Sequence, residues 1–108
     1  MKKTCLIAVY FGDFPYYFPF FKESCFSNSD YNWIIFNDSI GNKQEKNIKF
    51  INTSLEELSD LSSTVLGKKV ILKKPYKVCD LRPLFPLIFK DFLNDYEFWG
   101  HCDLDVIW

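Results

Sequence analysis

Hydrophobic and polar residues alternate along this chain in blocks that predict strands and helices in turn. Continuous apolar runs at residues 4–10 and 31–37 predict strands that are buried on both faces, as in a parallel sheet. A shorter apolar run at residues 48–51 and the segment 97–102 predict two further strands. The polar segment 39–47, between the second and third strands, is predicted to be a loop.

Two segments between these strands carry helical signals. Residues 15–26 predict a helix. Its true start is expected to be displaced toward Pro19, because proline is tolerated only in the first turn of a helix. Thr53 or Ser54, followed by two glutamates, is typical of a helix N-terminus. The helix that follows is predicted to end near Gly67, and four leucines share one of its faces: Leu55, Leu58, Leu61 and Leu66.

A third helix is predicted after a basic stretch. Residues 68–77 are predicted to be extended, because Pro75 disfavours helix immediately before it. Asp80 can cap the next helix, and Pro83 fits its opening turn. The predicted order is therefore strand, helix, strand, loop, strand, helix, loop, helix, strand. This alternation predicts an α/β sheet with right-handed crossovers.

Polar or glycine residues occur where three of the predicted strands end. In open α/β sheets, ligands bind beyond these carboxyl ends, so we expect the three groups to converge: Tyr10, Phe11 and Gly12; Asn37 and Asp38; Asp103, Leu104 and Asp105. Alternate side chains of a strand share a face, so Asp103 and Asp105 should point together while Leu104 packs behind them. Carboxylates suit hard cations such as Mg²⁺ or Mn²⁺, although a solvated strand terminus gives the same pattern.

Composition narrows the classes of function. The chain has 108 residues, which suffices for one domain with one core. Its 13 basic and 14 acidic residues give a net charge of −1, so no nucleic-acid partner is expected. No stretch approaches the roughly 20 apolar residues of a transmembrane helix. Aromatic residues make up 19%, which indicates either a compositional bias or an exposed apolar surface that self-associates.

The four cysteines give no sign of a metal site. Cys5, Cys25, Cys79 and Cys102 lack the close pairs of a zinc site, so they are predicted to be reduced and mostly buried.

Charged residues also cluster ahead of the third predicted helix. Lys77 and Arg82 can neutralise phosphate, and the carboxylate of Asp80 can accept from a ribose hydroxyl or a base N–H. The alternative is that Asp80 only caps the helix while the two basic side chains are solvated.

Two long motifs resemble one protein family. The runs KPYKVCD at residues 74–80 and FWGHCDLDVI at residues 98–107 are similar to bacterial glycosyltransferases associated with capsular or surface polysaccharide synthesis. The segments 10–12, 17–19 and 33–36, together with Pro15 and Asp38, resemble the same family. The resemblance covers essentially the whole chain and implies a Rossmann-like GT-A fold. In that fold, an α/β sheet with flanking helices binds a nucleotide sugar.

The resemblance also implies a role for each group of residues. Asp103 and Asp105 would hold Mn²⁺ or Mg²⁺ on the diphosphate of the nucleotide-sugar donor. The nucleotide would be bordered by the end of the first strand, Tyr10, Phe11 and Gly12. Asp38 would lie near the base.

The resemblance also implies that Lys77 and Asp80 would lie near the ribose or the diphosphate, with Arg82 a weaker candidate. His101 is expected to pack beside the motif rather than to take part in catalysis. The implied activity is hexosyl transfer to a glycan acceptor, in which the metal stabilises the departing nucleoside diphosphate. The implied location is cytoplasmic, either free or peripheral to the inner face of the membrane.

Enzymes of the GT-A type continue well beyond their Asp-x-Asp motif into segments that shape the acceptor site. The resemblance therefore predicts that residues 1–108 are a single N-terminal donor-binding portion, truncated after the Asp-x-Asp strand, and that only a full-length form binds the glycan. Two other functions stay open. One is a non-catalytic remnant or interaction module, and the other is a phosphatase of the haloacid dehalogenase type. That phosphatase motif usually has Thr or Val where this chain has Ile107.

Overall fold

The molecule is built on one five-stranded sheet, seen in a computed structural model that describes residues 2–105 and 108. The strand order is β3-β4-β2-β1-β5. The strands are β1 (Lys2–Tyr10), β2 (Tyr31–Asn37), β3 (Lys43–Glu45), β4 (Ile48–Asn52) and β5 (Tyr96–His101). The helices are α1 (Phe18–Ser27), α2 (Leu55–Leu66), the 3₁₀ helix η1 (Pro75–Leu84), α3 (Phe85–Ile88) and α4 (Lys90–Leu93).

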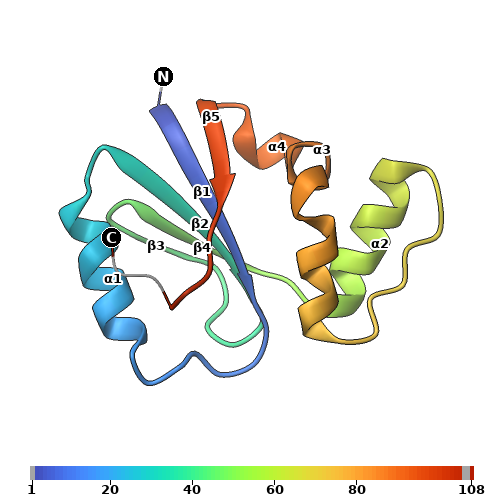
Figure 1. The fold of residues 1–108 in the computed structure, drawn as a ribbon, viewed down its shortest axis with the longest axis horizontal. Coiled ribbons are helices and arrows are strands. Elements are labelled where there is room, and N and C mark those ends of the chain that lie inside the picture. Colours follow the sequence, from blue (N-terminus) through green and yellow to red (C-terminus); the bar gives the residue numbers. More distant parts are fainter. Residues whose placement is uncertain (1, 106–107) are drawn as a thin grey trace.

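The sheet is mostly parallel. Strand β1 runs parallel to both of its neighbours, β2 and β5, and β4 runs parallel to β2. Only β3 is antiparallel, and it pairs with β4 at one edge. The chain moves from β1 outward to β4 and then returns to add β5 on the other side of β1, so the strand order reverses between β1 and β5 (Figure 1).

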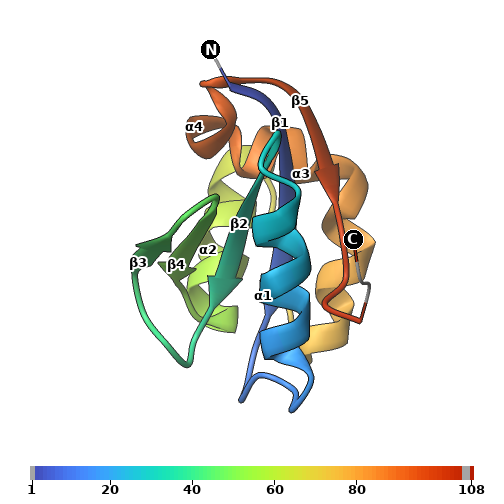
Figure 2. The ribbon, with the colours of Figure 1, turned by 90° about the vertical axis from the view of Figure 1, so that its left-hand side faces the viewer.

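Helices cover both faces of the sheet, as right-handed crossovers on the two sides of β1 require. Helix α1 lies on one face, and α2, η1, α3 and α4 lie on the other (Figures 1 and 2). Two separate apolar clusters fill the layers. The α1 cluster includes Ala8, Trp33, Ile35 and Phe21, and the opposite cluster includes Ile7, Ile34, Phe36 and Phe85. The predicted α/β layered sheet is therefore confirmed.

The apolar runs and the capped helix were predicted correctly. Strands β1, β2 and β4 fall on the apolar runs, and α1 begins at Phe18, beside Pro19. The Ser54 hydroxyl accepts a hydrogen bond from the backbone N–H of Glu57 at 3.0 Å and so caps α2. Helix α2 ends at Leu66 and is capped by Gly67, whose φ of 69° is the left-handed conformation that favours glycine.

Four predictions of local structure were wrong. Residues 43–45, which were expected in a loop, form β3 because their backbone pairs with β4. The stretch after Lys74 is not extended, since η1 starts at Pro75, and Asp80 lies inside η1 rather than capping a helix. The third helix is not one regular helix from Pro83, because η1 continues to Leu84 and two short helices follow.

The Asp-x-Asp motif lies just outside the strand that was expected to carry it. Strand β5 ends at His101, and Leu104 and Asp105 form a turn. Cys102 and Leu104 are buried in the α1 cluster, whereas Asp103 and Asp105 are exposed. The expected alternation of side chains thus continues beyond the strand. Val106 and Ile107, which end the second motif, lie outside the described residues.

Among residues 2–105 and 108, no helix is both long enough and apolar enough to span a membrane.

Candidate functional site at the ends of β1 and β5

The strand order reverses between β1 and β5, and two adjoining pockets lie beyond the carboxyl ends of these strands. This is the position at which open α/β sheets bind ligands. The larger pocket, of about 320 Å³, lies between the end of β1, η1 and Asp103. The smaller one, of about 240 Å³, lies between the end of β1, Tyr17 and the segment 102–105. Both pockets are lined by Tyr10 and Asp103, so they adjoin at these residues and together make up the candidate site.

The 3₁₀ geometry of η1 decides which of its side chains reach the site. A 3₁₀ helix has about three residues per turn, so side chains three apart share a face. Val78 and Leu81 are buried against the sheet. The next face carries Tyr76, Cys79 and Arg82, and all three line the larger pocket. The remaining face turns away from this pocket.

Arg82 is the residue of η1 that contacts the Asp-x-Asp motif. Its guanidinium group forms an ion pair and a hydrogen bond with Oδ1 of Asp103. The Asp103 side chain is still 59% exposed, so the pair leaves much of the carboxylate open to the pocket. Arg82 was the weaker candidate in the sequence, yet in the structure it lies closest to the predicted metal ligands.

Asp105 lies on the α1 side of the site. It lines the smaller pocket with Asp103 and Tyr17. Partial desolvation and then the charge of Asp105 raise the pKa of the Tyr17 phenol above its ordinary value of 10. Tyr17 therefore stays protonated at neutral pH and can donate a hydrogen bond to an anionic ligand. In the sequence, Tyr17 was part of the resemblance but was given no role at the site, because its proximity to Asp105 depends on how α1 packs.

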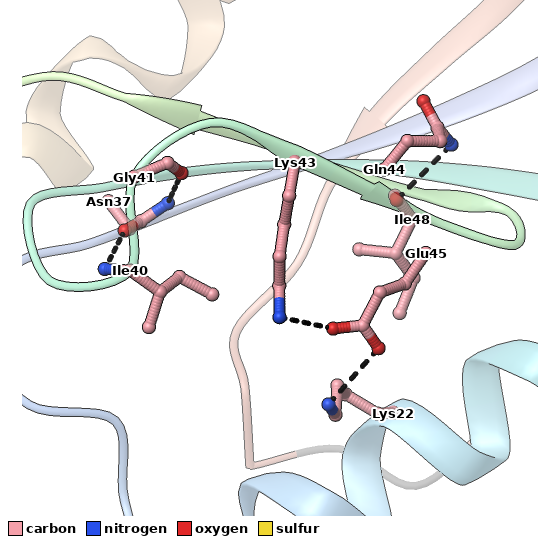
Figure 3. A network of polar contacts seen from close by, with 8 residues as sticks. All are labelled: Lys22, Asn37, Ile40, Gly41, Lys43, Gln44, Glu45 and Ile48. Carbon is pink, nitrogen blue, oxygen red and sulfur yellow. Dashed lines mark hydrogen bonds and ion pairs between the residues drawn. The ribbon is translucent and has the colours of Figure 1, made fainter.

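The ends of β1 and β2 meet, as predicted. The backbone N–H of Gly12 donates to Oδ1 of Asp38 at 2.8 Å, and the φ of Gly12 is 94°. Asn37 fixes the turn that follows β2, since its side-chain carbonyl accepts from the backbone N–H of Ser39 and from that of Ile40 (Figure 3). Phe11 lines the larger pocket, whereas Gly12 and Asp38 line neither pocket.

Lys77 and Asp80 are not brought to the site. They line a separate depression together with residues 70–73 and Leu81. The ammonium group of Lys77 lies 5.3 Å from the centre of the Tyr76 ring. The two residues share the third face of η1. They are close to Arg82 in sequence but do not line its pocket, because Arg82 lies on a different face of the helix.

His101 packs against aromatic rings, which fits the role expected from the sequence. Its ring centre lies 6.4 Å from that of Phe85 and 6.4 Å from that of Trp99. Cys102 is buried next to the motif, and burial raises the pKa of its thiol to about 12.

The residues present suit a magnesium or manganese ion that also binds a phosphate group. Within the described part of the chain, no three His, Cys, Asp or Glu side chains gather as a metal site. Mg²⁺ bound with nucleotides commonly takes only one or two carboxylates and completes its shell with phosphate oxygens and water. Asp103 and Asp105 in one pocket provide such a donor set.

Comparison with known proteins assigns the chain to a family. The model of one family, described as a family of unknown function (DUF6625), matches residues 6–108. The chain belongs to this family. The matched range of this DUF6625 protein includes every residue that lines the two pockets. Comparisons with curated proteins and with solved structures returned no match.

Proposed function

We propose that this chain is the donor-binding portion of a metal-dependent glycosyltransferase with a GT-A type fold. The observation that carries the proposal is the Arg82–Asp103 pair in a pocket where the strand order reverses. A guanidinium group binds phosphate oxygens through a planar fork of N–H donors. Carboxylates hold the cations that accompany diphosphates. Both kinds of group therefore face one pocket, which suits the diphosphate of a nucleotide sugar.

Each residue of the site has a role under this proposal. Asp103 and Asp105 would hold Mn²⁺ or Mg²⁺, and this ion would supply Lewis-acid stabilisation of the departing nucleoside diphosphate. Arg82 would exchange its bond to Asp103 for bonds to the diphosphate. The same guanidinium would therefore offset the charge of Asp103 in the empty site and bind phosphate oxygens in the filled site. Tyr17 would donate from its protonated phenol.

The nucleoside would lie along the end of β1. Tyr10 and Phe11 line the larger pocket there and offer aromatic surface to the base or ribose. Asp38 uses Oδ1 to hold the Gly12 turn, which leaves Oδ2 for a donor on the base. Lys77 and Asp80 stay predictions of the resemblance, and their separate depression supports no contact with the diphosphate.

The reaction that we propose is hexosyl transfer from this donor to a glycan in capsular or surface polysaccharide synthesis. The glycan acceptor would be bound by a longer form of the protein. We propose a cytoplasmic location, free or at the inner face of the membrane. A remnant that no longer catalyses transfer could keep the same donor site, so the decisive test is nucleotide binding rather than turnover.

Calorimetric titration with UDP and with GDP, each in the presence of Mn²⁺, tests the donor site. We expect one of the nucleotides to bind the wild type and Asp103→Ala/Asp105→Ala to lose that binding. The matched control is Asp30→Ala/Asp60→Ala, which removes two exposed carboxylates away from both pockets. Absent binding to the wild type, or equal binding to the wild type and the first variant, would overturn the proposal.

A second pair of variants tests the role of η1. Arg82→Ala and Lys77→Ala each remove one positive charge from the same helix, on different faces. A hydrogen bond to a charged group contributes about 1.5–3 kcal/mol, so Arg82→Ala should weaken nucleotide binding about 10- to 150-fold. Lys77→Ala should change it by less than about threefold. The reverse ranking would mean that the diphosphate lies in the other depression.

A further inference from the structure

Strand β5 forms one edge of the sheet, and half of its backbone groups face outward. Within the described residues, β1 is the only strand that pairs with β5. The backbone N–H of Cys102 donates to the carbonyl of Ile7 on β1 at 3.0 Å. Backbone groups of successive strand residues point to opposite sides, so the outward-facing residues of β5 are Glu97, Trp99 and His101.

The opposite edge of the sheet is protected against pairing, which makes the exposure of β5 informative. Strand β3 has only three residues and carries charges, two features that discourage edge-to-edge contact. Its Glu45 forms ion pairs with Lys43 at 2.6 Å and with Lys22 of α1 at 3.2 Å (Figure 3). Strand β5 has six residues and contains neither lysine nor proline.

Large apolar side chains stand on both faces of the β5 edge. Phe98 is 57% exposed and Trp99 is 37% exposed. Trp99 pairs in register with Cys5 and so faces the layer of η1 and α3, whereas Phe98 faces the α1 side. A depression of about 160 Å³ lies beside Trp99 between β5 and the short helices. The combination of an open strand edge and exposed aromatic rings is the usual basis of strand addition.

We propose that two copies of this chain pair through β5 in antiparallel orientation and join their sheets into one continuous sheet. A two-fold axis beside Trp99 would place Trp99 opposite Trp99 of the second copy. Glu97 would then lie opposite His101 of the second copy, and the reverse pair would repeat it. The imidazole N–H can donate to the carboxylate, so the edge is complementary to itself.

This register follows from the backbone and not only from the side chains. In an antiparallel pair, hydrogen bonds form between residues whose N–H and C=O both face the partner strand. Pairing 97 with 101 and 99 with 99 uses all three outward residues of β5. A slip by two residues toward the C-terminus would place Glu97 opposite Asp103, where like charges repel. On the other face, the proposed register puts the Phe98 ring across from Gly100, which has no side chain to obstruct it.

The proposal is independent of the donor site and is tested by sedimentation of the 108-residue protein over a range of concentrations. We expect a reversible monomer–dimer equilibrium. Trp99→Lys would place two ammonium groups face to face at the axis and should abolish the dimer. Phe20→Lys makes a similar change at a 67% exposed aromatic residue of α1 and should leave the dimer intact. A monomeric wild type, or a dimer that survives Trp99→Lys but not Phe20→Lys, would overturn the proposal.

Charge exchange tests the register. Glu97→Lys should raise the dimer dissociation constant about tenfold, because each dimer contains the pair twice. Adding His101→Glu to that variant should restore most of the affinity, and failure to restore it contradicts the register.

Hydrogen exchange of the wild type gives a readout that needs no variant. The amides of Glu97, Trp99 and His101 should become more protected as the protein concentration rises. Protection that does not change with concentration, in a range where the dimer forms, would place the contact elsewhere.

Discussion

Replacing Asn37 by alanine removes the side chain that holds the turn after β2. Asn37 is fully buried. Its carbonyl oxygen accepts from the backbone N–H of Ile40 at 2.8 Å and of Ser39 at 3.1 Å. Its amide N–H₂ group lies 3.4 Å from three backbone carbonyls, including that of Gly41, so these contacts are longer and weaker. Two well-formed hydrogen bonds are therefore lost on substitution.

The expected cost follows from those two bonds. Each contributes about 1 kcal/mol net, so Asn37→Ala should lower the free energy of unfolding by about 2 kcal/mol. For a domain of this size, that corresponds to a fall in Tm of about 8–16 °C. The slope of the urea transition should stay unchanged, because the substitution does not alter the surface exposed on unfolding.

Urea unfolding followed by tryptophan fluorescence measures this loss, with all variants at one protein concentration. Asn32→Ala is the matched control, since Asn32 lies in the same strand with a partly exposed side chain, and it should cost less than about 0.5 kcal/mol. If the two variants differ by less than about 1 kcal/mol, the buried amide does not hold the turn.

Three further perturbations have predictable signs. Hydrogen bonds from neighbouring lysines hold the pKa of Glu45 below its ordinary 4.5. Its charge therefore stabilises the fold above about pH 4.5, and the urea-midpoint gap between wild type and Glu45→Gln should shrink as the pH falls through the lowered pKa. Burial raises the pKa of Cys25 and Cys102 to about 12 from 9. Stability should therefore fall between about pH 9 and pH 12, and less steeply when both are alanine. A Cβ on Gly100 would lie 2.7 Å from Cδ2 at the end of the Leu6 side chain, which can shift, so Gly100→Ala should cost about 1 kcal/mol. Leu6→Ala should remove most of that cost in a double-mutant cycle.

Segments with a strong apolar pattern could be predicted from the sequence. The sequences of β1 and β2 are apolar on both faces of the strand. This pattern is typical of a strand that lies between two layers of helices. Helix α2 combines a capping serine, leucines on one face and a terminal glycine, so three independent signals agree there. The positions of the carboxyl ends of these strands then follow from topology. This is why the convergence of the ends of β1 and β2, where Gly12 meets Asp38, could be predicted.

Segments whose structure depends on backbone pairing or on helix type could not be predicted. Strand β3 is polar and forms because its backbone pairs with β4. Its sequence therefore contains no hydrophobic pattern from which a strand could be predicted. The helix η1 contains Pro83, which in an α-helical interpretation marks a start rather than an interior position. The preference for Lys77 over Arg82 came from the resemblance, whereas the side chains of η1 that reach the pocket depend on its three residues per turn.

The three-residue repeat of η1 makes the length of this helix a constraint on the site. One inserted or deleted residue turns everything beyond it by about 120°. A deletion between Val78 and Arg82 would therefore carry the guanidinium group off the pocket and bring a neighbour in its place, while the composition of the helix stayed almost the same. In this fold, the position of Arg82 along η1 determines whether its side chain reaches Asp103. Inserting or deleting a single residue before it would therefore be as damaging as replacing the arginine.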